Sequence, residues 1–222
     1  MNIDSRRCII LAVVTLASHS TNRKGVSRLL PSNTSLLILV VPLLLAYPHW
    51  GSAVALELIT IVDFESPEKA PGWRIVNDGV MGGLSQSQMS LTSEQTALFK
   101  GTVSLENNGG FASVRSEPTD FGLAGFSGLL LRIRGDGRKY QLRLRTDRNL
   151  DGIAYRASFG TTAGEWTAVK LDFQAFVPSF RGRRVAGAPA LDPARIRQIG
   201  FLISDYQEGR FQLEIASIKA YR

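Results

Sequence analysis

The sequence predicts an all-β fold, specifically a jelly-roll β-sandwich, and three observations support this prediction. Apolar and polar residues alternate with period two in several segments, such as Tyr140–Arg145, and this alternation is typical of strands with one face in a core. Clusters of turn-forming residues separate these segments at short intervals. Helical periodicity is nearly absent, and only Asp192–Arg197 favours a helical turn, with Asp192 as its cap.

The expected strands follow one another along the chain with short connections. In order they are Ile59–Phe64, Gln86–Thr92, Thr96–Leu105, Phe111–Ser116, Leu129–Arg134, Tyr140–Arg145, Ile153–Phe159, Thr167–Leu171, Gln198–Ser204 and Phe211–Ala216. The segment Phe176–Arg184, with basic and aromatic residues, is expected to be a loop. The alternation predicts which residues share a face, but it does not predict the order of the strands in the sheets.

The tripeptide Gly135-Asp136-Gly137 predicts a tight hairpin between two of these strands. Such a hairpin would carry a cationic strip on its outer face, made by Arg132, Arg134, Arg143 and Arg145. The strip suits an acidic partner, lipid headgroups or nucleic acid, and a solvated face that prevents edge pairing is the alternative interpretation. Aromatic residues that could stack on bases do not alternate with these arginines, so we expect no nucleic-acid partner.

The first 55 residues differ in composition from the rest and are predicted to be a cleavable targeting segment. They contain five basic residues and one acid, an apolar run at Leu36–Ala46, and the small-residue motif Ala53-Val54-Ala55. These features indicate an export signal. We therefore expect a leader over 1–55, a single domain over 56–222, and export into a periplasm or thylakoid lumen. The alternatives are an organelle interior and anchoring through an uncleaved leader; otherwise membrane association would be peripheral at most.

Removal of this leader would leave a domain with little capacity for nucleophilic or metal chemistry. Cys8, His19 and His49 are the chain's only cysteine and histidines, and all three precede Ala55. Their loss excludes a disulfide, a zinc site with Cys or His ligands, and a Ser-His-Asp site. The net charge falls from +7 for the chain to +3 for the domain, because five basic residues and one acid leave with the leader. We therefore predict that the protein is not an enzyme and holds no cofactor.

Two Gly-rich segments, Trp73–Ser85 and Leu105–Arg115, are the most informative part of the domain. Each combines Asn or Asp side chains with glycines, which suits either elaborate turns or polar binding loops. Met81, a flexible apolar side chain among glycines, is unusual for a plain turn and suits a contact surface or a fold-back into the core. The residues predicted to bind a partner or ligand are Asn77, Asp78, Met81, Asn108 and Arg115, together with Asp136 from the turn described above.

The spacing of carboxylates bears on two further kinds of site, a metal site and a pair of catalytic acids. Asp147–Gly152 matches the opening of a calcium-binding loop, D-x-N-x-D-G. Ser158 stands where an EF-hand loop has its final Glu, so a polar hairpin is the preferred interpretation and no metal is assigned. Acids for glycoside cleavage would come from residues such as Asp78 and Glu106, but nothing in the spacing selects two of them.

An ordered set of motifs over about residues 60–221 resembles the complex I intermediate-associated protein 30 family. The motifs are Trp73 with Asn77–Ser85, Phe99–Gly101, Asn108–Arg115, Arg134–Tyr140, Phe159, Trp166, Phe176–Pro178 with Arg181-Gly182, and Ile199–Asp205. The resemblance implies a galactose-binding-like jelly roll, which agrees with the strand pattern. It implies no catalytic residues, and it implies a role in the assembly of a respiratory complex.

We therefore expect a non-catalytic interaction module that acts as an assembly factor or chaperone for a membrane complex of the NADH dehydrogenase type, respiratory or photosynthetic. Its partners would be protein subunits of that complex, held by the two Gly-rich segments. The alternative is an extracytoplasmic carbohydrate-binding module with a glycan as its ligand. An enzyme that works with carboxylates is a third hypothesis, and it requires a deep pocket that holds two close acids.

Overall fold

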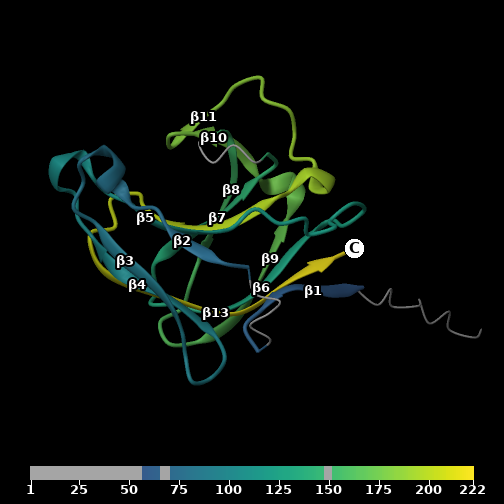
Figure 1. Cartoon of the computed structure of the whole chain (residues 1–222), viewed down its shortest axis with the longest axis horizontal. Helices are drawn as coiled ribbons and strands as arrows, with labels where there is room; N and C mark the ends of the chain where they lie inside the picture. Colours follow the sequence, from purple (N-terminus) through teal and green to yellow (C-terminus); the bar gives the residue numbers. More distant parts are fainter. Residues whose placement is uncertain (1–56, 66–70, 148–151) are drawn as a thin grey trace, which may run out of the picture. The chain divides into compact units, whose positions relative to one another are not determined.

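The computed structural model describes residues 57–65, 71–147 and 152–222, which all belong to one compact unit, Ser52–Arg222. Two antiparallel β-sheets pack face to face in this unit, and short turns and 3₁₀ helices connect the strands (Figure 1). The β-sandwich expected from the sequence is therefore confirmed. Within the described residues, no helix is long and apolar enough to cross a membrane.

The strand order of each sheet is defined over the described residues. The first sheet runs β3 (Gln86–Leu91), β4 (Ala97–Val103), β13 (Gly209–Tyr221), β6 (Gly128–Arg134) and β9 (Trp166–Asp172), and β1 (Leu58–Asp63) also pairs with β13. The second sheet runs β11 (Arg183–Arg184), β10 (Val177–Phe180), β8 (Ala154–Gly160), β7 (Lys139–Arg145), β12 (Gln198–Ile203), β5 (Ala112–Ser116) and β2 (Trp73–Ile75). The 3₁₀ helices are η1 (Asp78–Met81), η2 (Glu106–Asn108), η3 (Phe173–Ala175) and η4 (Pro193–Arg195).

The long strand β13 organises the first sheet, because three other strands pair with it. Its first half pairs with β4, its second half pairs with β1, and β6 lies along its other edge. A register shift between Ile215 and Ser217 marks a bulge at the change of partner. The partners of β13 are thus far apart in sequence, and the sheet depends on long-range pairing.

The hydrophobic core lies between the two sheets and is built from the inward-facing residues of both. Phe99 and Phe211 meet edge to face in the first sheet, with ring centroids 5.0 Å apart. Tyr140, Leu142 and Leu144 of β7 are fully buried. Because successive residues of a strand point to opposite faces, the residues between these three, including Arg143, project from the outer face of the second sheet.

The predicted hairpin at Gly135–Gly137 is wrong, because this turn carries the chain from one sheet to the other. β6 pairs with β13 and β9, whereas β7 pairs with β8 and β12. The Asp136 carboxylate stabilises the crossing by accepting hydrogen bonds from the Tyr140 hydroxyl (3.0 Å) and the Gln212 backbone N–H (2.9 Å). A tight turn signals a change of direction, but it does not determine which strand becomes the neighbour.

The expected cationic strip is therefore divided between the two sheets. Arg132 and Arg134 lie on the first sheet, and their guanidinium groups are 5.6 and 4.9 Å from the ring of Trp166. Arg134 also forms an ion pair with Glu214 (2.7 Å). The other two arginines, Arg143 and Arg145, belong to β7 in the second sheet.

Three strands of the described part were not expected from the sequence: β2 at one end of the second sheet, and β10 and β11 at the other. β2 is too short to show alternation. The segment expected to be a loop forms β10 and β11, joined by a two-residue turn in which Arg181 and Gly182 both have positive φ (48° and 77°). This pattern is typical of a type I′ hairpin turn. At η4, by contrast, the expected cap is present, because the Asp192 side chain accepts from the Ala194 N–H (3.0 Å).

We expect Gly101→Ala to destabilise the fold by about 1–3 kcal/mol, the usual range for overpacking a core. Gly101 lies in β4 between β3 and β13, and a Cβ atom there would come within 2.0 Å of the Gln86 carbonyl oxygen. The matched control is Gly160→Ala at the end of β8, where a Cβ atom meets nothing within 4 Å. Urea unfolding of both variants measures the effect, and equal midpoints for the two would contradict it.

Candidate functional site

The structure brings the two Gly-rich segments together around the side chain of Asp78. This carboxylate is fully buried and accepts four hydrogen bonds. Ser85 donates two of them, from its backbone N–H (2.9 Å) and its hydroxyl (2.5 Å). The backbone N–H groups of Gly110 (2.7 Å) and Phe111 (3.2 Å) donate the other two from the second segment. Asp78 therefore joins two segments that are more than thirty residues apart in sequence.

Glycines make this close approach possible. A Cβ atom at Gly83 would lie 2.4 Å from the Asp78 Cγ, and one at Gly109 would lie 2.7 Å from Oδ2. Both positions therefore require a residue without a side chain. Gly82 and Gly110 have φ values of 89° and 128°, which L-residues rarely adopt. The glycines that mark these segments in the sequence thus surround the carboxylate.

The pKa of Asp78 is lowered from its ordinary value of 3.8. Burial is the largest influence and acts to raise the pKa, but the hydrogen bonds from Ser85, Gly110 and Phe111 together outweigh it. The folded protein thus holds Asp78 as a carboxylate. Its neighbour Asn77 has a similar role, because its Oδ1 accepts from the Ser87 hydroxyl (2.8 Å) and the Ser113 N–H (3.2 Å).

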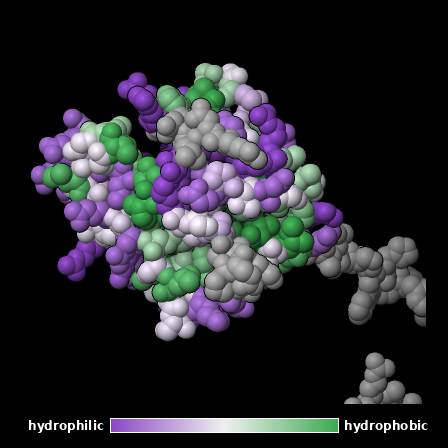
Figure 2. All heavy atoms as spheres, in the orientation of Figure 1, coloured by the Kyte–Doolittle hydropathy of each residue, from purple (hydrophilic) through white to green (hydrophobic). Residues whose placement is uncertain are grey.

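Two other predicted binding residues, Met81 and Asn108, lie on the surface at this end of the domain. Met81 is 59% exposed, and it is flanked by Val80 (74% exposed) and Leu84 (51% exposed). Asn108 is exposed on η2 with a φ of 58°, a left-handed conformation that Asn tolerates. Hydrophobic residues lie among hydrophilic ones at this end, on the left of the view in Figure 2. We call Val80, Met81 and Leu84 the apolar tip.

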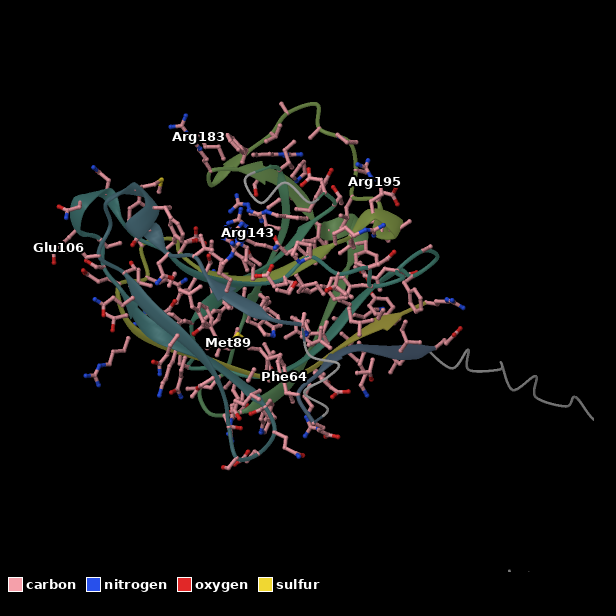
Figure 3. The ribbon with its side chains drawn as sticks, in the orientation of Figure 1. Phe64, Met89, Glu106, Arg143, Arg183 and Arg195 are labelled. Atoms are coloured by element: carbon pink, nitrogen blue, oxygen red, sulfur yellow. The ribbon has the colours of Figure 1, made fainter. Side chains whose placement is uncertain are left out.

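A pocket of about 700 Å³ lies beside the apolar tip, on the outer face of the second sheet. Residues of β5, β7, β8 and β12 line it, together with Val80 and Met81 on one side and Phe180–Gly182 of the β10–β11 turn. Its charged lining residues are Arg115, Arg143, Arg145, Arg156, Arg181 and Asp205. Arg143 points from β7 toward β10 and β11, and the nitrogen atoms of other basic side chains surround it in this view (Figure 3).

Burial and the positive charges of Arg156 and Arg115 together lower the pKa of Arg143 to about 10, and burial is the largest of these causes. The guanidinium still carries its charge at neutral pH. The pocket thus combines fixed positive charge with apolar walls, as ligand sites often do. Of the predicted binding residues, Met81 and Arg115 line it, whereas Asn77, Asp78, Asn108 and Asp136 do not.

Sequence reasoning missed the contribution of Arg156, Arg181 and Phe180 to this pocket. The alternation in β8 could have placed Arg156 on an outer face, but only the strand order shows that it lies opposite Arg143. Arg181 and Phe180 are in a segment expected to be a loop, and no signal in the sequence indicates that this segment extends the second sheet as β10 and β11.

The described residues contain no cluster of three or more His, Cys, Asp or Glu side chains that could hold a metal ion. Of the expected calcium loop Asp147–Gly152, residues 148–151 lie outside the described part of the chain. Asp205 is the only acid among the described residues that line the pocket. Glu106 is exposed on η2 while Asp78 is buried within its four hydrogen bonds, so these two acids do not form a catalytic pair in a pocket.

The fold and the site define a class: a galactose-binding-like β-sandwich with an apolar tip beside a basic pocket. Residues 62–215 match the family described as Complex I intermediate-associated protein 30 (CIA30). The match covers more than half of the chain, so this protein belongs to that family. The resemblance seen in the sequence is confirmed, and the family is named for association with an intermediate of complex I.

Curated relatives carry the same family name. Complex I intermediate-associated protein 30, mitochondrial, of Drosophila melanogaster is 26% identical over 72% of this chain and 61% of its own length. The protein of the same name in Mus musculus is 29% identical over 76% of this chain and 58% of its own length. The match thus spans about three fifths of each of these relatives.

Solved structures resemble the fold at low sequence identity. A family 11 carbohydrate-binding module of a cellulosomal cellulase from Clostridium thermocellum superposes with a TM-score of 0.55 and 16% identity, over 75% of this chain and 95% of the module. This similarity confirms the galactose-binding-like jelly roll, and at such identity it shows the fold alone.

We expect Asp78→Asn to destabilise the protein by about 3 kcal/mol, because hydrogen bonds to a buried charged group are among the strongest in a fold. The amide cannot accept all four bonds, and its NH₂ group would face backbone donors. The control is Asp120→Asn, since Asp120 is exposed and accepts one backbone hydrogen bond, from Gly122 (3.1 Å). Its ion pair with Arg197 (3.3 Å) lies at the surface, where such pairs contribute little to stability. Chemical unfolding measures both variants, and an unchanged midpoint for Asp78→Asn would contradict the structural role of the carboxylate.

The stability contribution of Asp78 should also depend on pH. Because its pKa is lowered in the folded state, the contribution is complete above the ordinary value of 3.8 and is lost as the pH falls through the lowered pKa. The difference in unfolding free energy between the wild type and Asp78→Asn should therefore be constant near neutral pH and shrink below pH 3.8. Paired denaturation curves over this range measure it, and a difference that persists in acid would argue against a lowered pKa.

Proposed function

We propose that this protein is a non-catalytic assembly factor that binds subunits of a membrane complex of the NADH dehydrogenase type before they are assembled. Membership of the CIA30 family supports a complex of this type as the source of the partner subunits. The exposed apolar tip supports binding through an apolar contact. An unassembled subunit exposes apolar surface that its neighbours later cover. A rigidly held apolar patch can occupy such a surface for a time.

The observation that best supports this proposal is that the apolar tip is attached to Asp78 and its hydrogen-bond donors. Val80 and Met81 belong to η1, which begins at Asp78 itself, and Leu84 directly precedes Ser85. The exposed side chains are therefore held at both ends by residues of the cluster. A contact surface ordered before binding loses less conformational entropy when a partner docks.

We propose that the domain over 56–222 acts after removal of the leader, in an organelle interior or after export across a membrane. The mitochondrial relatives support the organelle interior, and the leader composition supports transport. Asn108, exposed on η2, is placed to extend the contact surface beyond the tip.

The alternative to an assembly factor is a carbohydrate-binding module, and the sandwich fold supports this alternative. The charged lining of the pocket, five arginines and one aspartate among the described residues, does not suit a neutral glycan. A glycan array with the full chain tests the alternative, and specific glycan binding that survives changes in the apolar tip would favour it over assembly.

The double variant Val80→Asp, Met81→Asp should lose binding to its client subunit by about tenfold or more, as expected for central apolar contacts. Affinity capture of the full chain from membranes of its own source, in mild detergent and quantified by mass spectrometry, measures recovery of NADH dehydrogenase-type subunits. Leu91→Asp is the control, because Leu91 at the end of β3 is exposed (57%) to nearly the same extent as Met81 (59%) and lies outside the apolar tip. Unchanged recovery with the double variant, or no such subunits with the wild type, would count against the proposal.

A further inference from the structure

The register of the second sheet places four arginines in one row across its outer face. Arg74 pairs with Arg115, and Arg115 pairs with Gly200. Gly200 also pairs with Arg143, and Arg143 pairs with Arg156. Residues directly opposite each other in antiparallel strands point to the same face. The row therefore runs over β2, β5, β12, β7 and β8, and its last four positions lie in the pocket.

This row opposes folding when it is considered alone, because like charges placed directly opposite each other on a sheet are destabilising. Arg143 and Arg156 form such a pair. The Nε of Arg143 is buried and has no hydrogen-bond partner among the described residues, although it is a donor. The Oε1 of Gln198, another lining residue, is likewise buried and unpaired within the described part of the chain. Among the described residues, the pocket thus contains one unsatisfied donor, the Nε of Arg143, and one unsatisfied acceptor, the Oε1 of Gln198.

Gly200 interrupts the row and places no side chain between Arg115 and Arg143. A Cβ atom there would lie 2.7 Å from the Val114 carbonyl oxygen and 3.1 Å from the Arg115 Cβ, so a side chain does not fit. Arg115 and Arg143 are separated by this one strand, and their backbones are therefore roughly 10 Å apart. A ligand that reaches the floor at Gly200 has a guanidinium on each side.

The β10–β11 turn adds a fifth guanidinium on the other side of the pocket. Arg181 occupies the first position of a type I′ turn with a φ of 48°, where Asn or Gly is preferred. Its guanidinium lies 5.4 Å from the centre of the Phe180 ring, and both residues line the pocket. An arginine in this unfavourable conformation is consistent with a functional constraint on its side chain.

We propose that the pocket binds a small phosphate-bearing molecule with an apolar or aromatic portion, whose phosphate groups lie on the arginine row. A guanidinium group can donate two parallel hydrogen bonds to two oxygens of one phosphate, and a phosphate can also bridge two neighbouring arginines. The volume suits a ligand of the size of a nucleotide. Phe180 and Phe111 provide the apolar walls for the rest of the molecule. This binding activity is independent of the proposed assembly role and does not require it.

Calorimetric titration of the full chain with inorganic pyrophosphate and with a nucleoside diphosphate tests the proposal. Both should bind, and the nucleoside diphosphate should bind more tightly because its base contacts the apolar walls. Arg143→Ala and Arg156→Ala should each weaken pyrophosphate binding by about ten- to a hundredfold, the range for losing hydrogen bonds between charged groups. Arg195→Ala is the matched control, because Arg195 is exposed on η4 and does not line the pocket.

Two further measurements separate binding from folding. Arg156→Ala should keep or raise the melting temperature, since it relieves the charge pair with Arg143. Arg181→Asn should also keep or raise it, because Asn suits the turn, while it weakens binding of both ligands. Phe180→Ala should weaken only the nucleoside diphosphate. The absence of binding of either ligand at millimolar concentration would overturn the proposal. Heat signals that sodium chloride of equal ionic strength reproduces would also overturn it, and so would unchanged affinities in Arg143→Ala and Arg156→Ala.

Discussion

The buried carboxylate of Asp78 is the interaction on which the arrangement of this end of the domain depends. It replaces the lost hydration of one charge with four hydrogen bonds, two from its own segment and two from the segment that ends at Arg115. The Oδ1 of Asn77 supports the same junction by accepting from the Ser113 N–H of the second segment. The apolar tip and one side of the basic pocket both extend from η1, so the two surfaces depend on the same carboxylate.

Period-two alternation predicted most strands well, because burial of one face imposes that pattern on each strand separately. The neighbours of a strand depend instead on contacts far along the chain, which explains the error at Gly135–Gly137. For the same reason the arginine row could not be predicted, although Arg115 and Arg143 were noted individually. The row crosses β12 at Gly200, and because glycine has no side chain, the sequence does not show which face of the sheet this position belongs to.

Asp78 and Asn77 show how far residue type alone can predict a role. The sequence marks the polar side chains among the glycines, but it does not indicate whether they face a partner or the protein itself. The decisive contact is the hydrogen bond from the Gly110 N–H to the Asp78 carboxylate. It joins a residue that precedes β3 in the sequence to one that follows β4. Val80 and Met81, which follow Asp78 in η1, are a weaker signal in the sequence, yet their side chains are the exposed ones.

The position of β13 in the chain has a consequence for synthesis. Its partners β1, β4 and β6 are all made before it, and none of them is fully paired until β13 arrives. A growing chain therefore presents open strand edges and an uncovered half of the core for most of its synthesis, and long-range pairing of this kind is slow. The first sheet can therefore close only when the last strand of the chain has been made.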